Sequence, residues 1–417
     1  MTARGFTEVS DRLEPVIDSL RARRGHLSGV SVYKMLELFE DFGARLAGDE
    51  GTRSIEGIGF LANWLRSSNL LKMLKLNLNG DPDYLERFVP FGRDFLAAKP
   101  HGLACMWMAG NVPTLPLFSL VPALLAKNLC LMKLAYPDPY GLDEILRVLE
   151  VSGTGDLSGQ EIMQAFRLVW FDYEQRDLNV EMSLAADIKV MWGGELAIKG
   201  ITSLPRREHC GEIVFGPKYS IGLIDRKLLE RGKVDPVIAS FVKDINIFDQ
   251  RACSSPQTIF IEKNDRFTLR QIGEKFAEQL EKLPPKQVLD PYMTLQIEKA
   301  RARWALDAER DVIASGDGAN WTVCMDREIS LKDAVQSRTV FLTEIESWRD
   351  VIPLINPKMQ TIGIALLERE DAVSFADQST LAGAARCVRP GLMNVQESPW
   401  DGKLFINELV RWVTLKP

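Results

Sequence analysis

Short apolar runs separated by a longer apolar segment define the first recognisable unit of this chain. Leu103–Met108 and Leu129–Leu134 have the length and composition of buried strands, and Leu117–Ala126 between them has the length of a helix. A strand, a helix and a second strand in this order form one βαβ unit of a parallel sheet. The pattern therefore predicts an α/β fold.

Patterns of apolar residues also predict helices and strands over most of the rest of the chain. Apolar residues at helical spacing near the N-terminus predict a helical layer, and alternating or continuous apolar runs further on predict strands. The expected helices span Tyr33–Leu46, Ile58–Leu76, Leu142–Val151, Phe267–Leu283 and Pro291–Ala308, and the further strands span Leu168–Phe171, Thr258–Glu262 and Ile362–Leu367.

Length and charge narrow the class of protein. The chain has 417 residues, of which 46% are hydrophobic, enough for a large core and two domains. Its net charge of −6 argues against nucleic acid or an anionic membrane as a partner. No apolar run reaches the roughly 20 residues that span a bilayer, and the first 25 residues are too charged for a secretory signal. We expect a cytoplasmic protein.

Cysteine and histidine usage disfavours metal and hydrolase chemistry. The six cysteines include no C-x-x-C pair, so the sequence indicates no zinc site, and we expect no disulfide framework in a chain of this length. Three histidines offer little for a Ser-His-Asp triad or a histidine-rich metal centre. No bound metal is expected.

The stretch DQRACSSPQTIFIE, residues 249–262, places Cys253 among small and polar residues just before an expected strand. Pro256 prevents a helix from continuing through this segment. A thiol on such a loop lies at the end of a sheet, where backbone N–H groups can lower its pKa and stabilise an oxyanion. The alternative is that Cys253 is a small buried hydrophobic residue.

Two polar residues fall at the ends of the strands in the βαβ unit. Asn111 follows the first strand in the turn formed by Ala109–Pro113, and Lys133 stands near the end of the second. Ligands of parallel sheets bind outside the carboxyl ends of the strands. Asn111 and Lys133 are therefore candidate site residues.

These segments together resemble the aldehyde dehydrogenase superfamily. AGNVPTLP, PALLAKN and LMKLAYPDP are similar to its P-W-N-x-P, A-L-A-x-G-N and V-x-K-P-S patterns, and DQRACSSPQ is similar to its G-Q-x-C loop. The ending C-S-S-P-Q and the later SPWDG resemble the long-chain fatty acyl-CoA reductases of bacterial bioluminescence. The resemblance extends from about His101 to Asp401.

The resemblance implies an aldehyde-dehydrogenase-like fold, with a Rossmann-like cofactor domain and an α/β catalytic domain. We expect the N-terminal helices and the NAD(P)-binding domain in residues 1–220 and the catalytic domain in residues 221–390. Residues 391–417 would return to the cofactor domain or to an oligomer interface.

The resemblance also assigns roles to single residues. Cys253 would be the nucleophile, with the Asn111 amide and the Cys253 backbone N–H as oxyanion donors, and Lys133 would bind the adenosine ribose or a 2′-phosphate. Trp192, Gly193 and Gly194 end the expected strand DIKVMWGG, where the superfamily's F-T-G-S loop approaches the cofactor phosphates. The alternative for the two glycines is a tight strand-to-helix turn.

Three other positions depart from expected motifs. Val214, in CGEIVFGPKYSIGLID, stands where aldehyde-oxidising members carry the glutamate that activates water, so release of a free acid is disfavoured. The E-x-F-G-P motif has no clear match near Glu344. The glycines of GTGDLSG, residues 153–159, follow a helix, so we interpret this segment as a surface loop and not as a nucleotide-binding loop.

The predicted function is NADPH-dependent reduction of an acyl thioester to an aldehyde, with NADH as the alternative cofactor. The donor would be an acyl-CoA or acyl-carrier-protein thioester, and a homo-oligomer or an acyl-activating synthetase would be the protein partners. The alternatives are an oxidising or CoA-acylating aldehyde dehydrogenase, and a catalytically silent scaffold for an acyl-activating partner.

Overall fold

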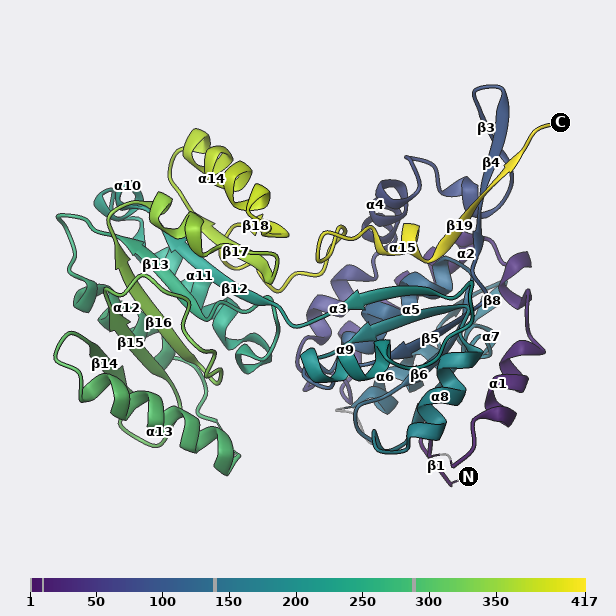
Figure 1. Cartoon of the computed structure of the whole chain (residues 1–417), viewed down its shortest axis with the longest axis horizontal. Coiled ribbons are helices and arrows are strands. Elements are labelled where there is room, and N and C mark those ends of the chain that lie inside the picture. Colours follow the sequence, from purple (N-terminus) through teal and green to yellow (C-terminus); the bar gives the residue numbers. More distant parts are fainter. Residues whose placement is uncertain (1, 10, 138–140, 287–289) are drawn as a thin grey trace. The chain divides into compact units, whose positions relative to one another are not determined.

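The computed structural model describes residues 2–9, 11–137, 141–286 and 290–417. The chain divides into two compact units, each built on its own seven-stranded sheet (Figure 1). Unit 1 comprises Met1–Pro217 with Gln396–Pro417, and unit 2 comprises Lys218–Val395. The end of the LMKLAYPDP motif, Asp138 and Pro139, lies outside the described residues.

The sheet of unit 1 is parallel except for the β1–β2 pair at its edge. From β5 the chain continues to β6 and β9 on one side, and then places β10 and β11 on the other, so a topological switch point lies between β5 and β10. In spatial order the strands are β1 (Thr2–Arg4), β2 (Thr7–Val9), β9 (Phe166–Trp170), β6 (Leu129–Lys133), β5 (Leu103–Trp107), β10 (Ile188–Trp192) and β11 (Gly211–Phe215).

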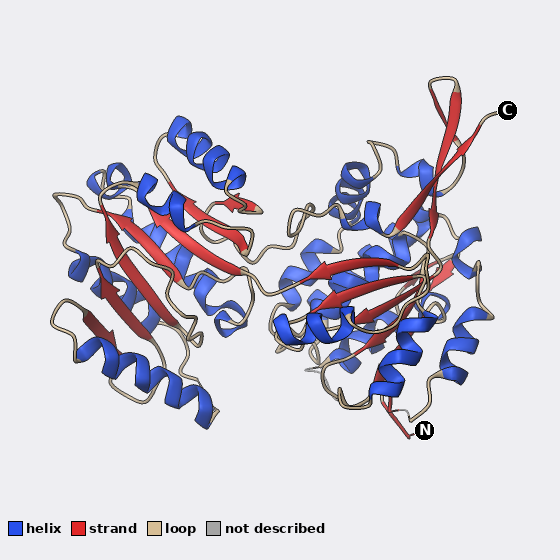
Figure 2. Ribbon diagram, viewed as in Figure 1, coloured by secondary structure: helices blue, strands red, loops and turns tan. Residues whose placement is uncertain are grey.

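The central strands β5, β6 and β10 are buried along their whole length, because helices cover the sheet (Figure 2). The predicted βαβ unit is confirmed, with its two strands parallel. The helices of unit 1 are α1 (Glu14–Arg21), α2 (Val32–Gly48), α3 (Ile58–Trp64), α4 (Ser67–Asn77), α5 (Leu115–Leu125), α6 (Leu142–Glu150), α7 (Gly159–Met163), α8 (Arg176–Ala185), α9 (Glu195–Thr202) and α15 (Phe405–Glu408), with 3-10 turns η1 (His26–Gly29) and η2 (Pro82–Leu85).

Two sequence predictions in unit 1 need correction. The segment Ile58–Leu76 forms two helices, since the backbone of Arg66 is extended (φ −57°, ψ 135°) between α3 and α4. The segment 153–159, expected to be a surface loop, instead forms a small hairpin, β7 (Gly153–Thr154) and β8 (Leu157–Ser158), followed by the start of α7. Gly159 is required for packing, because a Cβ there would lie 1.7 Å from the carbonyl oxygen of Leu149.

A second, antiparallel sheet of unit 1 brings the C-terminal strand next to residues early in the chain. It consists of β3 (Val89–Phe91), β4 (Asp94–Pro100) and β19 (Val410–Leu415) in the order β19-β4-β3. These three strands extend away from the rest of unit 1 (Figure 1). Phe91 on this ribbon is 57% exposed.

The sheet of unit 2 is parallel except for the β14–β15 pair. The predicted strand Thr258–Glu262 is confirmed as β13 with the same bounds. In spatial order the strands are β14 (Asp311–Ala314), β15 (Thr322–Asp326), β16 (Thr339–Ile345), β13 (Thr258–Glu262), β12 (Tyr219–Ile224), β17 (Met359–Ala365) and β18 (Arg386–Val388). The helices are α10 (Arg226–Glu230), α11 (Val234–Asn246), α12 (Leu269–Glu281), α13 (Pro291–Ala305) and α14 (Arg369–Leu381), with shorter segments η3 (Ile247–Gln250) and η4 (Trp348–Leu354).

A pair of glycines makes room for an aromatic ring in the core of unit 2. Gly222 on β12 and Gly363 on β17 are register partners. A Cβ at either position would lie within 2.8 Å of the Phe241 ring of α11, at 2.6 Å for Gly222 and 2.8 Å for Gly363. The two glycines therefore let α11, which leads into the Cys253 loop, pack directly onto the centre of the sheet.

We expect Gly222→Ala to lower the free energy of unfolding by about 1–3 kcal/mol, because the new methyl group overpacks a buried site. Urea denaturation measures this change. Gly316→Ala is the matched control, since a Cβ at Gly316 meets nothing within 4 Å. Equal effects of the two substitutions would contradict the packing argument.

Candidate active site

A cavity of about 520 Å³ opens at the carboxyl ends of the strands of unit 1, around the switch point. Trp107 ends β5, Lys133 ends β6 and Trp192 ends β10, and all three line the cavity. Its other walls come from α8 and from one face of α9. This volume and position are typical of a cofactor or substrate site in an open α/β sheet.

Among the described residues that line this cavity, the charged groups are both basic, Lys133 and Arg176. Lys133 is 9% exposed, and its ammonium group lies 4.9 Å from the centroid of the Phe171 ring. Burial lowers the pKa of Lys133, while the nearby Asp172 acts in the opposite direction. The cavity therefore combines apolar and aromatic walls with two cationic groups, which suits a planar ligand that carries phosphate.

The strand-to-helix turn after β10 forms where the sequence predicts it. Trp192 stacks on Phe215, with ring centroids 3.8 Å apart, and lines the cavity. Gly193 and Gly194 connect it to α9, and Gly194 is the N-cap residue. A Cβ at Gly193 would lie 3.0 Å from the Cβ of Ala197, so this glycine serves close packing of the helix. The phosphate-binding role of the turn stays a prediction.

Asn111 lies in the turn between β5 and α5, at the carboxyl edge of the same sheet, and is half-buried. The ring of Tyr136 packs against this turn. A Cβ at Gly110 would lie 2.2 Å from that ring, so a larger residue there would displace Tyr136. The predicted position of Asn111 at the end of a strand is therefore confirmed, and its catalytic role stays a prediction.

Cys253 lies in unit 2, in the turn between η3 and β13, and is half-buried. This is the amino end of β13, as the sequence predicts. Burial raises the pKa of each of the other five thiols, those of Cys105, Cys130, Cys210, Cys324 and Cys387. Those five thiols are poor candidates for a nucleophilic thiolate.

The backbone that leads to Cys253 is left-handed over three consecutive residues. Phe248, Asp249 and Gln250 have φ angles of 54°, 47° and 64°. None is glycine, and a left-handed conformation costs roughly 1–2 kcal/mol for each ordinary residue. Such a segment persists only where surrounding contacts hold it, and such strain is concentrated at functional sites.

Two buried glutamines hold this backbone. The side-chain amide of Gln250 donates hydrogen bonds to the carbonyls of Pro256 (2.8 Å) and Thr339 (3.1 Å). The amide of Gln257 donates to the carbonyls of Gln250 (3.2 Å) and Ser255 (3.3 Å). The glutamines thus join the two ends of the Cys253 loop to each other and to β16.

The turn at Cys253 is held at two further points. The Ser220 hydroxyl, on β12, donates to the Cys253 carbonyl at 2.7 Å. The Asn394 side-chain oxygen accepts hydrogen bonds from the hydroxyls of Ser254 (2.7 Å) and Ser255 (3.3 Å). Because both serines and Asn394 are buried, these contacts fix the residues that immediately follow the thiol.

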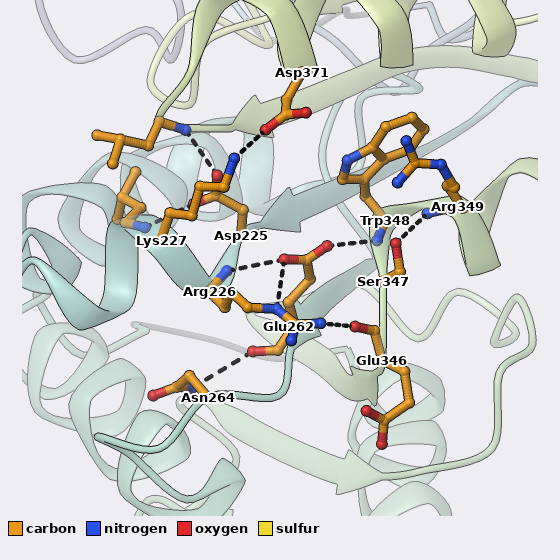
Figure 3. Close-up of polar contacts among 12 residues, drawn as sticks. Asp225, Arg226, Lys227, Glu262, Asn264, Glu346, Ser347, Trp348, Arg349 and Asp371 are labelled. Carbon is orange, nitrogen blue, oxygen red and sulfur yellow. Dashed lines mark hydrogen bonds and ion pairs between the residues drawn. The ribbon is translucent and has the colours of Figure 1, made fainter.

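At the carboxyl ends of the strands in the same sheet, carboxylates cap nearby backbone N–H groups (Figure 3). Glu262, at the end of β13, accepts hydrogen bonds from the backbone N–H groups of Trp348 (2.6 Å) and Arg226 (3.0 Å). Asp225, directly after β12, accepts from the N–H of Leu228 at 2.8 Å and caps α10. In unit 2, these carboxylates at the carboxyl ends of the strands bind the unit's own backbone, and the candidate nucleophile lies at the amino ends.

Two carboxylates outside the cavity and the Cys253 loop form structural ion pairs. Glu212 on β11 forms ion pairs with Lys189 (3.4 Å) and Arg206 (3.5 Å). Glu344 on β16 pairs with Arg327 at 2.9 Å. Val214 lies on β11 and packs against the core of unit 1.

The described residues show neither a cluster of metal ligands nor a membrane-spanning helix. Among the residues with described positions, no group of three or more His, Cys, Asp or Glu side chains is arranged to hold a metal ion. Within the same residues, no helix combines the length and the apolar character needed to cross a bilayer.

Several site residues were not identified from the sequence. Arg176 and Asn179 belong to α8, and Asn179 accepts a hydrogen bond from the Trp107 indole at 3.0 Å. Asn394 is brought to the Cys253 loop from 140 residues further along the chain. The polar residues at the start of α8 match no motif that indicates a site. The contact between Asn394 and the Cys253 loop joins distant parts of the chain, so only the fold reveals it.

Comparisons with known proteins place the chain among acyl reductases. A family model described as "Acyl-CoA reductase (LuxC)" matches residues 49–412. A long-chain acyl-protein thioester reductase of Aliivibrio fischeri is 25% identical over 344 residues, covering 80% of this chain and 68% of that protein. A reductase of the same description from Photorhabdus laumondii is 26% identical over 366 residues, covering 85% and 72%.

Solved structures of aldehyde dehydrogenases resemble this fold. Aldehyde dehydrogenase 21 of Physcomitrella patens matches with a TM-score of 0.70 and 12% identity, covering 97% of this chain and 89% of that one. Glyceraldehyde-3-phosphate dehydrogenase GapN of Methanocaldococcus jannaschii, complexed with NADP, matches with a TM-score of 0.68 and 12% identity, covering 98% and 94%. The predicted aldehyde-dehydrogenase-like fold is confirmed.

We expect Asn394→Ala to lower the free energy of unfolding by about 1–3 kcal/mol, since it removes the acceptor for two buried serine hydroxyls and the donor to the Asp244 carbonyl. Urea denaturation is the measurement. The exposed Asn356, which also bonds to nearby backbone, provides the control Asn356→Ala. A loss for Asn394→Ala no larger than that of the control would show that the buried network contributes little.

Proposed function

Because this chain belongs to the acyl-CoA reductase (LuxC) family, we propose that it reduces an acyl thioester to an aldehyde through an acyl-enzyme on Cys253. The observation that carries the assignment of the nucleophile is the Cys253 loop: a half-buried thiol that follows a strained backbone segment, in a loop that four buried side chains hold in place. A fixed nucleophile lowers the barrier by avoiding the entropy of orientation.

The first step is attack of the Cys253 thiolate on the thioester carbonyl. The new C–S bond forms, the donor's C–S bond breaks, and the donor leaves as a thiol after taking up a proton. The Asn111 amide and the Cys253 backbone N–H are the proposed donors to the oxyanion, on the strength of the family resemblance. A nicotinamide cofactor, which Lys133 and Arg176 would hold, would supply hydride to the acyl carbon. The bond between that carbon and the Cys253 sulfur would then break, giving an aldehyde and returning the proton to the thiol.

Val214 supports reduction over hydrolysis. An apolar side chain at this position cannot activate water, so the acyl-enzyme keeps its thioester bond until hydride arrives. The oxidising aldehyde dehydrogenase that releases a free acid is therefore the less favoured alternative.

The proposed cofactor is NADPH, bound in the cavity of unit 1. Lys133 and Arg176 supply positive charge, and the described residues that line the cavity include no carboxylate to oppose the 2′-phosphate of NADPH or to bind the 2′-hydroxyl of NADH. The indoles of Trp107 and Trp192 offer apolar surface to the planar parts of the cofactor.

The proposed acyl donor is a fatty acyl group carried by coenzyme A or by a protein. The relatives named above are long-chain acyl-protein thioester reductases, which supports a protein-bound donor and an acyl-activating synthetase as a partner. A homo-oligomer is also proposed. The extended β19-β4-β3 ribbon, with the exposed Phe91, supports it as a surface for self-association. The cytoplasm remains the expected compartment.

Arg176→Ala should raise the KM for NADPH at least about tenfold, because a charge-assisted hydrogen bond to the 2′-phosphate is lost. The KM for NADH, which has no 2′-phosphate, should change much less. Steady-state kinetics with both cofactors measures the ratio. Arg147→Ala, on the exposed face of α6, is the control and should alter neither value. An equal loss for both cofactors would rule out a role of Arg176 in recognising the 2′-phosphate.

Intact mass spectrometry after mixing the protein with a panel of acyl-CoAs, without cofactor, tests the acyl-enzyme. Wild type should gain the mass of one acyl group, and NADPH should remove it, whereas Cys253→Ala should gain nothing. Cys387→Ala is the matched control, since this second half-buried thiol should be dispensable. Acylation that persists in Cys253→Ala would overturn the assignment of the nucleophile.

If no acyl-CoA acylates the protein although NADPH binds, the donor is a protein-bound acyl group, and acyl-carrier protein replaces acyl-CoA in the same assay. If neither acylation nor NADPH binding occurs, the scaffold alternative takes the place of the enzyme.

A further inference from the structure

Lys286 lies in unit 2 with its ammonium group buried between two turns. Its side chain is 8% exposed, and Nζ lies 3.3 Å from a carboxylate oxygen of Asp249. Nζ also donates hydrogen bonds to the carbonyl of Ser337 at 2.6 Å and to the Ser337 hydroxyl. The backbone N–H of Lys286 donates to the side chain of Asn320 at 3.0 Å, which anchors the residue itself.

The two turns that Lys286 contacts are both left-handed. One is Phe248–Gln250, and the other is Gln336–Arg338, whose φ angles are 67°, 54° and 55°. Neither turn contains glycine. They pair directly, because the Ser337 N–H donates to the Asp249 carbonyl at 3.0 Å and the Ser337 hydroxyl donates to the Asp249 carboxylate at 2.9 Å. Each strained turn therefore depends on the other and on the cation between them.

The first turn is continuous with the candidate nucleophile. Gln250, its last residue, stands three positions before Cys253 and binds the carbonyl of Pro256, three positions after it. The same amide binds Thr339, the residue that follows the second turn. A change in the pairing of the turns would thus reach the Cys253 loop through Gln250.

We propose that Lys286 is a positioning residue, whose ammonium group locks the two left-handed turns together and so fixes the loop that carries Cys253. The proposal rests on the proposed function in one respect, since it takes Cys253 as the nucleophile. Lys286 acts through Asp249 and Ser337 and takes no part in bond making.

Lys286 is charged at neutral pH. Burial lowers the pKa of Lys286 to about 8; Asp249 acts to raise it, and Arg338 and Arg251 act to lower it further. Below pH 8 the lysine is therefore charged and can bind the Asp249 carboxylate.

Hydrogen–deuterium exchange tests the lock without relying on catalysis. In Lys286→Met, backbone amides of residues 247–257 should exchange at least about tenfold faster than in wild type at pH 7, since a buried ion pair is lost. Lys286→Arg, which keeps the charge, should restore most of the protection. Lys275→Met is the control, because Lys275 forms a more exposed ion pair with Asp235 (2.8 Å) elsewhere in unit 2.

A reciprocal variant keeps the test decisive if Lys286→Met folds poorly. Asp249→Asn removes the same ion pair from the other side and should give the same increase in exchange. The double variant Asp249→Asn/Lys286→Met should add little to either single variant, as expected for one shared interaction. Unchanged exchange at 247–257 in the single variants, or an equal increase in Lys275→Met, would overturn the proposal.

Thioester-dependent NADPH oxidation at pH 7 supplies the second arm. Lys286→Met should have a kcat lower by about 10²-fold with little change in KM, and Lys286→Arg should restore most of that kcat. A kcat of Lys286→Met equal to that of wild type would contradict the proposed lock. Absence of any activity in the wild type would count against the proposed function alone, since the exchange measurement does not require turnover.

Discussion

The conformation of the backbone around Cys253 is the constraint on which the site in unit 2 depends. Three residues without glycine, Phe248–Gln250, hold left-handed angles directly before the loop. That geometry is unfavourable in isolation, so buried amides and hydroxyls must stabilise it. Gln250, Gln257 and Asn394 satisfy this requirement with hydrogen bonds to the loop and its neighbours. The sheet, the segment that contains Asn394 and the turn Gln336–Arg338 together hold the half-buried Cys253 thiol in position.

The two units use their parallel sheets in different ways. In unit 1 the carboxyl ends at the switch point leave a cavity lined by Lys133 and Arg176, the arrangement expected of a nucleotide site. In unit 2 Asp225 and Glu262 cap the backbone at the corresponding ends, and Cys253 lies at the amino ends instead. In the proposed function, unit 1 would bind the hydride donor and unit 2 would carry the acyl group.

The sequence predicted those parts that depend on local pattern. Thr258–Glu262 alternates β-branched and aromatic residues and forms β13 as predicted, and Asn111 follows its strand as expected. Arg176 gave no signal, because a single arginine in a polar stretch resembles any surface arginine. Lys286 meets Ser337 across 51 residues, and only the fold brings them together. The left-handed turns oppose local backbone preference, so no propensity could have indicated them.

Deuteride transfer is the measurement that tests the central claim most directly. The purified acyl-enzyme would be mixed once with NADPH carrying deuterium at the transferable position, and the product analysed by mass spectrometry. The account predicts an aldehyde with one deuterium at the former carbonyl carbon and release of the acyl group from Cys253. A free fatty acid, or an aldehyde without deuterium, would contradict it and indicate that hydrolysis or another route discharges the enzyme.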